Sequence, residues 1–351
     1  MNDFAAERQW LEAAEVFDTH IDTDIPARLW GRDPRREGRL GRWTPFFGHT
    51  DWPRLHRGGF DGAAYDLATW PFRGAGGRLA ALFANVARVK ALAAASPLVA
   101  VVNSMPEHRA ARAKGQVALW LAVQGGNALS ANPSALDGPL GAAIHRITLV
   151  HLMSSDIGGT SSPTGSDTGL TQLGLSLMAA CHRNRVLVDL AHAGKRTFWD
   201  AIAAHDTKFP PVVTHTGVNG AYRSWRNLDD DQIVAIADRG GFVSVILHSG
   251  FLRAFPKLAT SDDVARHLEH VVQVGGEDVV AFGSDWDGFI LPPSDLPDCL
   301  SMPTLLRTLR RRNWTEQRIE KMLGLNVKRV LTALRPDPIT TPGSAPMPAV
   351  R

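Results

Sequence analysis

Five runs of apolar residues along the chain each end in a polar residue. Four of these end residues, Asp22, His192, His215 and Asp285, are of types that bind metal ions, and the fifth is Gln124. In a (β/α)8 barrel the carboxyl ends of all strands open onto one face, so polar residues that end buried strands meet there. The pattern therefore predicts an α/β barrel with a metal site at its strand ends, in which one position is an amide.

The order of the remaining elements supports a single barrel. Segments rich in β-branched residues alternate with segments of helical periodicity, which is typical of parallel βαβ units. The second expected strand contains several glycines, which weaken strands, and is the least regular. Ser261 and Thr315 precede acidic residues and are expected to cap helices. The predicted fold is an α/β (β/α)8 (TIM) barrel in one domain over residues 1–334. The expected strands are 16–17, 58–64, 117–124, 147–151, 186–192, 211–215, 242–248 and 279–285, and the expected helices are 78–95, 106–114, 170–183, 195–204, 229–239, 261–274, 303–312 and 315–334.

Two segments lie outside this alternation. Residues 26–53 follow the first strand and are rich in Arg, Gly, Pro and Trp, so we expect a long loop over the catalytic face of the barrel. Its arginines either attract an anionic substrate or belong to a solvated loop with Asp33 and Glu37 as partners, and the second interpretation is favoured. Residues 335–351 are rich in proline and predict a loosely packed C-terminal tail.

Composition excludes several classes of protein. The 351 residues carry a formal charge of only +3, and the basic residues are dispersed among acidic ones, which argues against a nucleic-acid partner. Cys181 and Cys299 are the only cysteines, so no disulfide framework is expected. The first ten residues lack the pattern of a signal peptide, and no charge-free apolar run approaches the roughly 18 residues of a membrane span. We therefore expect a cytoplasmic protein without a membrane partner.

The candidate metal chemistry begins at the first strand. Residues two apart on a strand point to the same side, so His20 and Asp22 can hold one cation together. An isolated His-x-Asp pair is common, but His192 and His215 also end apolar runs. Asp285 ends another, and a buried carboxylate needs a cation or several donors to stay ionised. Together these residues favour a metal site over unrelated polar residues of the core.

The same stretches resemble a known family. From about residue 17 to 330 the chain resembles the membrane dipeptidase (renal dipeptidase) family of metal-dependent, amidohydrolase-type barrels. That resemblance implies a binuclear zinc barrel that hydrolyses dipeptides, often with a D-residue tolerated at the C-terminal position. The matching stretches are DTHID at 18–22, GG at 125–126, VDLAH at 188–192, TH at 214–215, RN at 226–227, FGSDWDG at 282–288, WTE at 314–316 and LGLN at 323–326.

The resemblance also implies how metal would be held. His20, Asp22 and Asp285 would bind one zinc ion, with His192 and His215 on a second. Relatives carry a bridging glutamate before the Gly-Gly pair, and this chain has Gln124 there. A carboxylate offsets the repulsion between two dications about 3.5–4 Å apart, whereas an amide offers one neutral oxygen. We therefore expect one tight zinc site and a weak or absent second site; the alternative is that Gln124 still coordinates and both ions bind.

Other roles follow from the resemblance. His151 matches a histidine that stabilises the oxyanion of the tetrahedral intermediate, a task for a hydrogen-bond donor. Arg226 matches the arginine that binds the substrate's C-terminal carboxylate, which a guanidinium can do bidentately. If the reaction is hydrolysis, Asp285 would accept a proton from the attacking water and pass it to the leaving amine. His248 stands where relatives carry an aromatic residue, and it is an additional ligand, an acid–base group or, as we favour, a polar pocket wall.

Three functions remain open at this stage. The first is hydrolysis of a dipeptide or a related small amide. The second is an enzyme on the same barrel with a changed substrate or reaction, such as the tailoring of a peptide-derived metabolite, which Gln124, His248 and the altered loop after His151 motivate. The third is a catalytically silent homologue, and the retention of five costly buried polar groups speaks against it. The resemblance further implies a homodimer.

Overall fold

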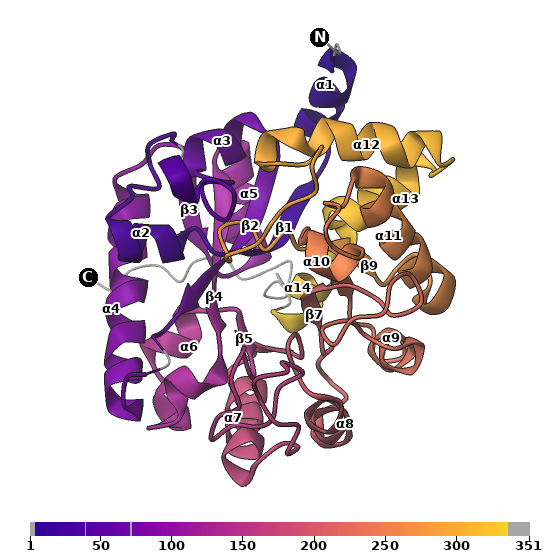
Figure 1. Ribbon diagram of the computed structural model, residues 1–351. Coiled ribbons are helices and arrows are strands. Elements are labelled where there is room, and N and C mark those ends of the chain that lie inside the picture. Colours follow the sequence, from indigo (N-terminus) through magenta and orange to yellow (C-terminus); the bar gives the residue numbers. More distant parts are fainter. Residues whose placement is uncertain (1–3, 39, 71, 336–351) are drawn as a thin grey trace, which may run out of the picture.

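The computed structural model describes residues 4–38, 40–70 and 72–335, and its strands form a closed parallel barrel. The barrel strands are β1 (Val16–Ile21), β2 (Phe60–Ala68), β4 (Val117–Gln124), β5 (Arg146–Thr148), β6 (Leu187–Asp189), β7 (Val213–Thr216), β8 (Val243–Val245) and β9 (Val280–Phe282). Strands β1, β2, β4, β5 and β6 pair in that order, as do β7, β8 and β9. Single bridges, Ile21 to Trp286 and Asp189 to Val212, join the two sheets at both seams. The predicted (β/α)8 barrel is confirmed, with the helices outside the strands (Figure 1).

Each expected strand has a counterpart, including the glycine-rich second one, which extends to Ala68. One further strand, β3 (Val99–Val102), was not expected. It pairs with the first half of β4, from Val117 to Trp120, while β5 pairs with the last residues of β4. Its four residues are all apolar and give no alternation of apolar and polar positions, and a run this short cannot be assigned to a strand by periodicity.

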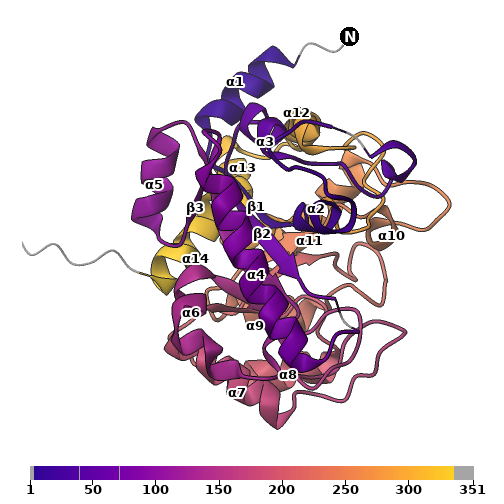
Figure 2. The same ribbon diagram turned by 90° about the vertical axis from the view of Figure 1, so that its left-hand side faces the viewer.

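The expected helices are present around the barrel. In Figure 2 the longest of them, α4, runs across the near side of the molecule. The last expected helix consists of three consecutive pieces, one of them a π-helical turn. None of the described helices is long and apolar enough to cross a membrane. They are α4 (Ala75–Ala94), α5 (Met105–Ala113), α7 (Gln172–Arg183), α8 (Lys195–Ala204), α9 (Asp230–Ala237), α11 (Ser261–Gly275), α12 (Met302–Arg311), α13 (Glu316–Glu320), η5 (Lys321–Leu325) and α14 (Asn326–Leu334).

Helix caps agree with the sequence at one position and differ at another. Thr315 caps α13 by accepting a hydrogen bond from the Arg318 amide, as expected. Helix α11 is capped by Thr260 and not by Ser261, because Thr260 and Asp263 form a reciprocal capping box. The prediction was wrong by one residue. Short helices that the periodicity did not predict are α1 (Ala5–Ala13), α2 (Asp24–Trp30), α3 (Trp52–Arg57), α6 (Pro139–Ala143) and α10 (Ser249–Leu252), with 3₁₀ turns η1 (Gly41–Trp43), η2 (Gly126–Leu129), η3 (Pro133–Asp137) and η4 (Cys299–Ser301).

The Arg-rich segment 26–53 contains most of α2 and the turn η1, and it is fixed to the loop after β9. The Asp287 carboxylate accepts hydrogen bonds from the backbone amides of Gly48 at 2.6 Å and His49 at 2.8 Å. Arg35 pairs with Asp33 at 2.9 Å, as the solvated-loop interpretation expects. The action of this segment as a lid stays a prediction. The predicted tail 335–351 lies, apart from its first residue, outside the described part of the chain.

Alternation along β4 explains how the barrel positions its polar residues. Leu119, Leu121 and Val123 belong to the core between strands and helices, whereas Ala118 and Trp120 belong to the cluster that fills the lower barrel. Successive side chains on a strand point to opposite faces, so Gln124 points into the barrel like Trp120, at the carboxyl end. The apolar side chains inside the barrel and the polar residue at its carboxyl end therefore both follow from the two-residue period of side chains along β4.

Candidate metal centre and substrate pocket

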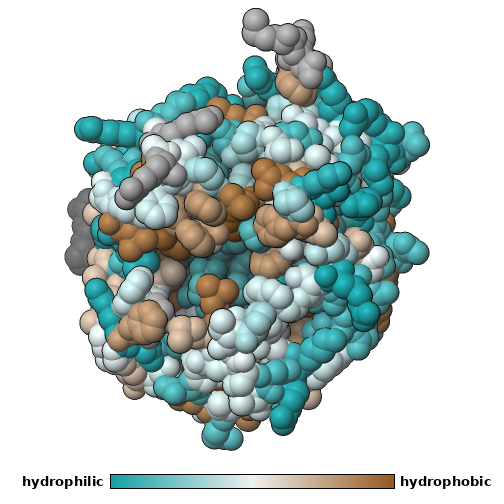
Figure 3. Space-filling model, viewed as in Figure 1, coloured by the Kyte–Doolittle hydropathy of each residue, from teal (hydrophilic) through white to brown (hydrophobic). Residues whose placement is uncertain are grey.

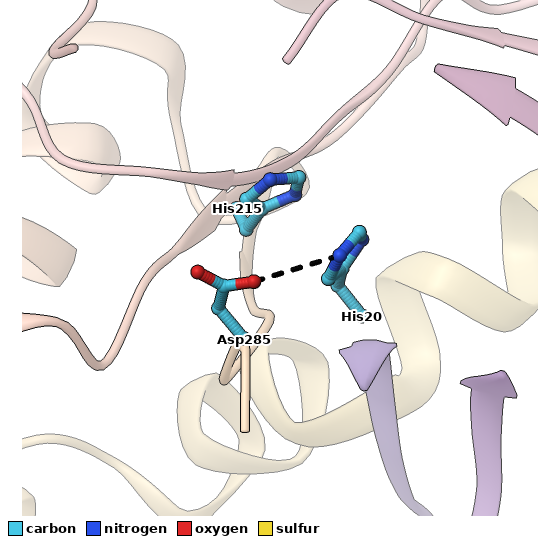
Figure 4. Close-up of side chains that lie close together, drawn as sticks. All are labelled: His20, His215 and Asp285. Carbon is cyan, nitrogen blue, oxygen red and sulfur yellow. Dashed lines mark ion pairs between the residues drawn. The ribbon is translucent and has the colours of Figure 1, made fainter. Parts of the chain in front are cut away.

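The strand ends bring the predicted metal ligands together. His20 and His215 lie on β1 and β7, and Asp285 lies three residues beyond the end of β9. One ligand atom from each of these three buried residues lies within 4.8 Å of the others, and Figure 4 shows their side chains facing one another. Nε2 of His20 is 3.6 Å from Oδ1 of Asp285 and 3.5 Å from Oδ2 of Asp22. The resemblance implies that His20 and His215 bind different ions, and that assignment stays a prediction; the structure places ligand atoms of both residues in one compact group.

His192 completes the cluster from the other side. Its Nε2 lies 2.8 Å from Nε2 of His215. His192 and Asp285 both have positive φ angles, 64° and 62°, in the left-handed region that side chains other than glycine seldom adopt. Such conformations cost of order 1–3 kcal/mol and persist where the surrounding structure imposes them, commonly at functional sites. Both residues leave their strands through a sharp turn that directs the side chain into the barrel mouth.

Burial determines the charge of these groups. It raises the pKa of Asp22 to about 8, with a further contribution from the carboxylates of Asp287 and Asp24. Burial, followed by the charge of Asp22, raises the pKa of Asp285 well above its ordinary value. Burial also lowers the pKa of His20 to about 4. The pocket thus disfavours the ionised forms of Asp22 and Asp285 and the protonated form of His20. A bound cation would stabilise the two carboxylates and lower their pKa values again.

A buried ionic network supports the two strand histidines from below, and sequence reasoning missed it. The guanidinium of Arg146 lies inside the barrel, where it donates to Asp66 and, at 2.7 Å, to Asp189. Oδ2 of Asp66 is 3.1 Å from Nδ1 of His20. A guanidinium nitrogen of Arg146 also lies 3.4 Å from Nδ1, but the Asp66 carboxylate is the nearer group and favours a proton on Nδ1, so the lone pair of Nε2 faces the metal cluster.

His215 is oriented by the same network through one hydroxyl. Thr214 donates its proton to Oδ2 of Asp189 at 2.7 Å, so its oxygen is left to accept from Nδ1 of His215 at 3.0 Å. His215 thus also presents an Nε2 lone pair, which accepts the Nε2 proton of His192. Arg146 holds both carboxylates, and the two carboxylates set the tautomers of two candidate ligands.

Gln124 differs from a carboxylate in the way it meets the cluster. Its amide nitrogen lies 3.2 Å from Nε2 of His20, and its oxygen is buried without a hydrogen-bond partner among the described residues. The opposite amide orientation would place the oxygen against the lone pair of His20. Gln124 is therefore a hydrogen-bond donor to a candidate metal ligand, a role that an ionised glutamate cannot take.

A cavity of about 190 Å³ opens beside the cluster. Figure 3, viewed as in Figure 1, shows a hollow on this face with hydrophobic residues beside it. The cavity contains the four predicted residues His151, Arg226, His248 and Asp285, so the structure brings the expected substrate side chains to one place. Burial lowers the pKa of His151 to about 3, which leaves a neutral imidazole. The apolar lining comes from Leu152, Trp225, Ile246, Phe251, Phe289 and Ile290.

Arg226 is the basic group of this cavity. It is 3 % exposed and forms no ion pair with another described residue. One Nη donates to the carbonyl of His215 at 2.5 Å, and Nε has no hydrogen-bond partner in the described part of the chain. Burial lowers its pKa to about 10, so the side chain stays charged near neutral pH. A buried guanidinium with open donors fits an anionic group, above all a carboxylate.

The residues present fit a metal ion. Asp22 and Asp285 supply carboxylate oxygens, and His20 and His215 supply neutral imidazole nitrogens, which are the ligand types of zinc. Oδ1 of Asp22 is buried without a partner among the described residues, a cost that a cation would remove. The carboxylates behind His20 and His215 are the outer partners that histidine ligands commonly have.

Comparison with known proteins now decides the family. A family model described as membrane dipeptidase (peptidase family M19) matches residues 5–336. The chain belongs to the membrane dipeptidase family. Among solved structures, a metallopeptidase of this family called dipeptidase AC is 26 % identical, with a TM-score of 0.79, and the match covers 91 % of this chain and 98 % of that one. The barrel is thus that of a dipeptidase-family protein.

Curated relatives match over shorter stretches. An uncharacterized dipeptidase of Schizosaccharomyces pombe is 33 % identical over 224 residues, which is 62 % of this chain and 53 % of that protein. An uncharacterized protein of Klebsiella pneumoniae, encoded in the pqqA 5' region, is 36 % identical over 176 residues, or 49 % of this chain and 64 % of the relative. The match therefore spans less than two thirds of either relative.

Proposed function

We propose that the protein is a zinc-dependent hydrolase that cleaves the amide bond of a dipeptide or a small peptide-derived substrate. The observation that carries this proposal is that the buried guanidinium of Arg226, which forms no ion pair with another described residue, lines the same small cavity as Asp285, beside the metal cluster. A carboxylate bound to Arg226 would bring the adjoining amide bond near the cluster. The small cavity volume favours a substrate of dipeptide size over a longer peptide.

Zinc, when bound by His20, Asp22 and Asp285, would polarise the scissile carbonyl and lower the pKa of the attacking water. Asp285 would accept the proton of that water and deliver it to the leaving amine. His151 is a neutral imidazole at the cavity wall, and its N–H would donate to the oxygen on which negative charge develops. His192, His215 and Gln124 would line a second, weaker metal position.

The test is a hydrolysis assay on protein that has been stripped with a chelator and reloaded with zinc. Free dipeptides should be cleaved, and the same peptides with an amidated C-terminus should be poor substrates because they lack the carboxylate for Arg226. The variant Arg226→Met should cleave the free and amidated forms with nearly equal kcat/KM. Zinc-independent turnover, or an unchanged preference for the free carboxylate in Arg226→Met, would refute the proposal.

A second candidate is an enzyme of the same site with a changed substrate or reaction in the tailoring of a peptide-derived metabolite. Gln124 favours this second candidate, because an amide bridges two metal ions less well than a carboxylate, and the usual activation of water by two metals would then be weaker. Poor cleavage of all dipeptides together with tight binding of zinc would support this candidate over the first. The cytoplasmic location and the homodimer stay predictions.

A further inference from the structure

His248 lies in the wall of the substrate cavity, three residues after the end of β8. Its ring packs edge-on against Phe251, with ring centroids 4.6 Å apart, and Phe251 packs edge-on against Trp225 at 5.1 Å. Trp225 directly precedes Arg226 in the chain. The three rings therefore form a continuous wall that links His248 with the guanidinium proposed to bind the substrate carboxylate.

The backbone fixes the tautomer of His248. The amide of Leu291 donates a hydrogen bond to Nδ1 at 3.0 Å, and the amide of Ser249 donates to the carbonyl of Leu291 at 2.8 Å. The segment 248–249 and the loop at Leu291 are thus joined by two hydrogen bonds in opposite directions. Burial lowers the pKa of His248 to about 4, so the ring is neutral near pH 7. Because Nδ1 acts as an acceptor, the single ring proton lies on Nε2.

This arrangement leaves His248 with one open donor and no open acceptor. Nε2 has no hydrogen-bond partner among residues 4–38, 40–70 and 72–335, and it is not among their buried unpaired atoms. The only lone pair of the ring nitrogens is held by Leu291. His248 therefore has none left for a metal ion or for general-base catalysis, which argues against these two roles.

We propose that His248 determines substrate specificity by donating its Nε2 proton to an uncharged oxygen, an amide carbonyl or a hydroxyl, on the side chain of the substrate's C-terminal residue. The inference rests on the proposed function, since Arg226 places the C-terminal residue along the aromatic wall. Leu152, Ile246 and Ile290 contribute apolar lining to the same cavity. A site with a fixed donor in apolar surroundings rejects an analogue without an acceptor, because the donor then loses its water without a replacement.

The test uses the isosteric pair Ala-Asn and Ala-Leu, each with the L or the D form of the second residue, on the zinc-loaded protein. The wild type should prefer the asparagine peptide, and His248→Phe, which keeps an aromatic ring and removes the donor, should lower the ratio of kcat/KM values about tenfold. His248→Gln offers an amide N–H near the position of Nε2 and should restore part of the preference. An unchanged ratio in His248→Phe, or a wild-type preference for the leucine peptides, would overturn the inference.

Failure of the proposed function gives a different result. If the zinc-loaded wild type cleaves none of the four peptides, hydrolysis of dipeptides is refuted. The inference is then tested by calorimetric binding of the same uncleaved peptides to the wild type and both variants. An Asn-to-Leu affinity ratio that falls about tenfold in His248→Phe supports the donor role. Equal ratios in both proteins, or no binding of any peptide to the wild type, refute it.

Discussion

The side-chain amide nitrogen of Gln124 lies 3.2 Å from Nε2 of His20, on the side of the ring that faces the metal cluster. The Asp66 carboxylate lies next to the other ring nitrogen, Nδ1, so the lone pair of His20 is on Nε2 and is directed at Gln124. A metal ion would compete with the Gln124 amide for that lone pair. The substitution that the sequence identified as a weaker bridging ligand is therefore also a hydrogen-bond donor to a candidate ligand of the tight site.

Gln124→Glu is expected to increase metal binding and hydrolysis together. A carboxylate cannot donate to His20, and it adds a negative charge between the candidate metal positions. Metal analysis of protein purified without chelator should show a single tightly held zinc in the wild type and an additional ion in the variant. Dipeptide turnover should rise by at least about tenfold, the effect of roughly 1.4 kcal/mol in the barrier. Gln124→Met, similar in length and uncharged, is the control and should gain neither; equal zinc content in wild type and Gln124→Glu would contradict the expectation.

Thr214→Val tests whether the hydroxyl relay orients His215. Valine has nearly the same shape, but it removes the oxygen that connects Nδ1 of His215 to Asp189. Loss of such an outer partner commonly weakens metal binding 10–100-fold, and we expect a loss in that range in competition with a chromophoric chelator. Nitrogen NMR of the variant, after a chelator has removed its metal, should show that His215 no longer prefers the Nδ1-protonated form.

Thr216→Val is the matched control on the same strand. Thr216 is equally buried, and its hydroxyl donates to the carbonyls of Gly217 and Arg226 instead of contacting the histidine relay. Thr216→Val should lower the free energy of unfolding without a comparable change in zinc affinity. A similar loss of zinc affinity in both variants would mean that metal binding depends on any buried hydroxyl of β7. A specific relay from Asp189 through Thr214 to His215 would then be refuted.

The sequence predicted the fold and the outline of the site because both depend on local patterns. Parallel strands with polar ends converge on one face, so His20, His215 and Asp285 could be assigned to a common site before any distance was known. The supporting network was not predictable in this way. Asp66 lies beyond the point where glycine-rich β2 was expected to end, and Arg146 starts β5 with a charge that resembles a loop residue. Their roles depend on partners distant in the chain.

Gly288→Ala is expected to disturb the carboxylates of the site. A methyl group at this position would lie 2.5 Å from Oδ1 of Asp285 and 2.8 Å from Oδ2 of Asp22. The carboxylates would have to move away from the methyl group, so zinc affinity and turnover should fall by at least about tenfold, as expected for ligands displaced by a fraction of an ångström. Gly76→Ala in α4 is the control, because a methyl there meets nothing within 4 Å and alanine favours a helix. Wild-type zinc affinity in Gly288→Ala would refute the steric argument.

The last prediction concerns acid stability at a site away from the metal cluster. His267 on α11 accepts a hydrogen bond from the amide of Val218 at 3.0 Å, and its other ring nitrogen lies 3.2 Å from the carbonyl of Leu252. Burial lowers the pKa of His267 to about 4 from its ordinary value of 6.5. As the pH falls from 6.5 to 4, the unfolded chain takes up a proton at this residue and the folded protein does not, so the free energy of unfolding decreases, by up to about 3 kcal/mol.

His267→Gln should therefore be less stable than the wild type at pH 7 and lose less stability on acidification. The measurement is urea unfolding of the chelated protein at pH 7 and pH 5, where metal release cannot contribute. His56→Gln, the same substitution at an exposed histidine, is the matched control. If His267→Gln loses as much unfolding free energy between pH 7 and pH 5 as the wild type does, the folded protein already binds the proton at His267, and burial does not hold this histidine neutral.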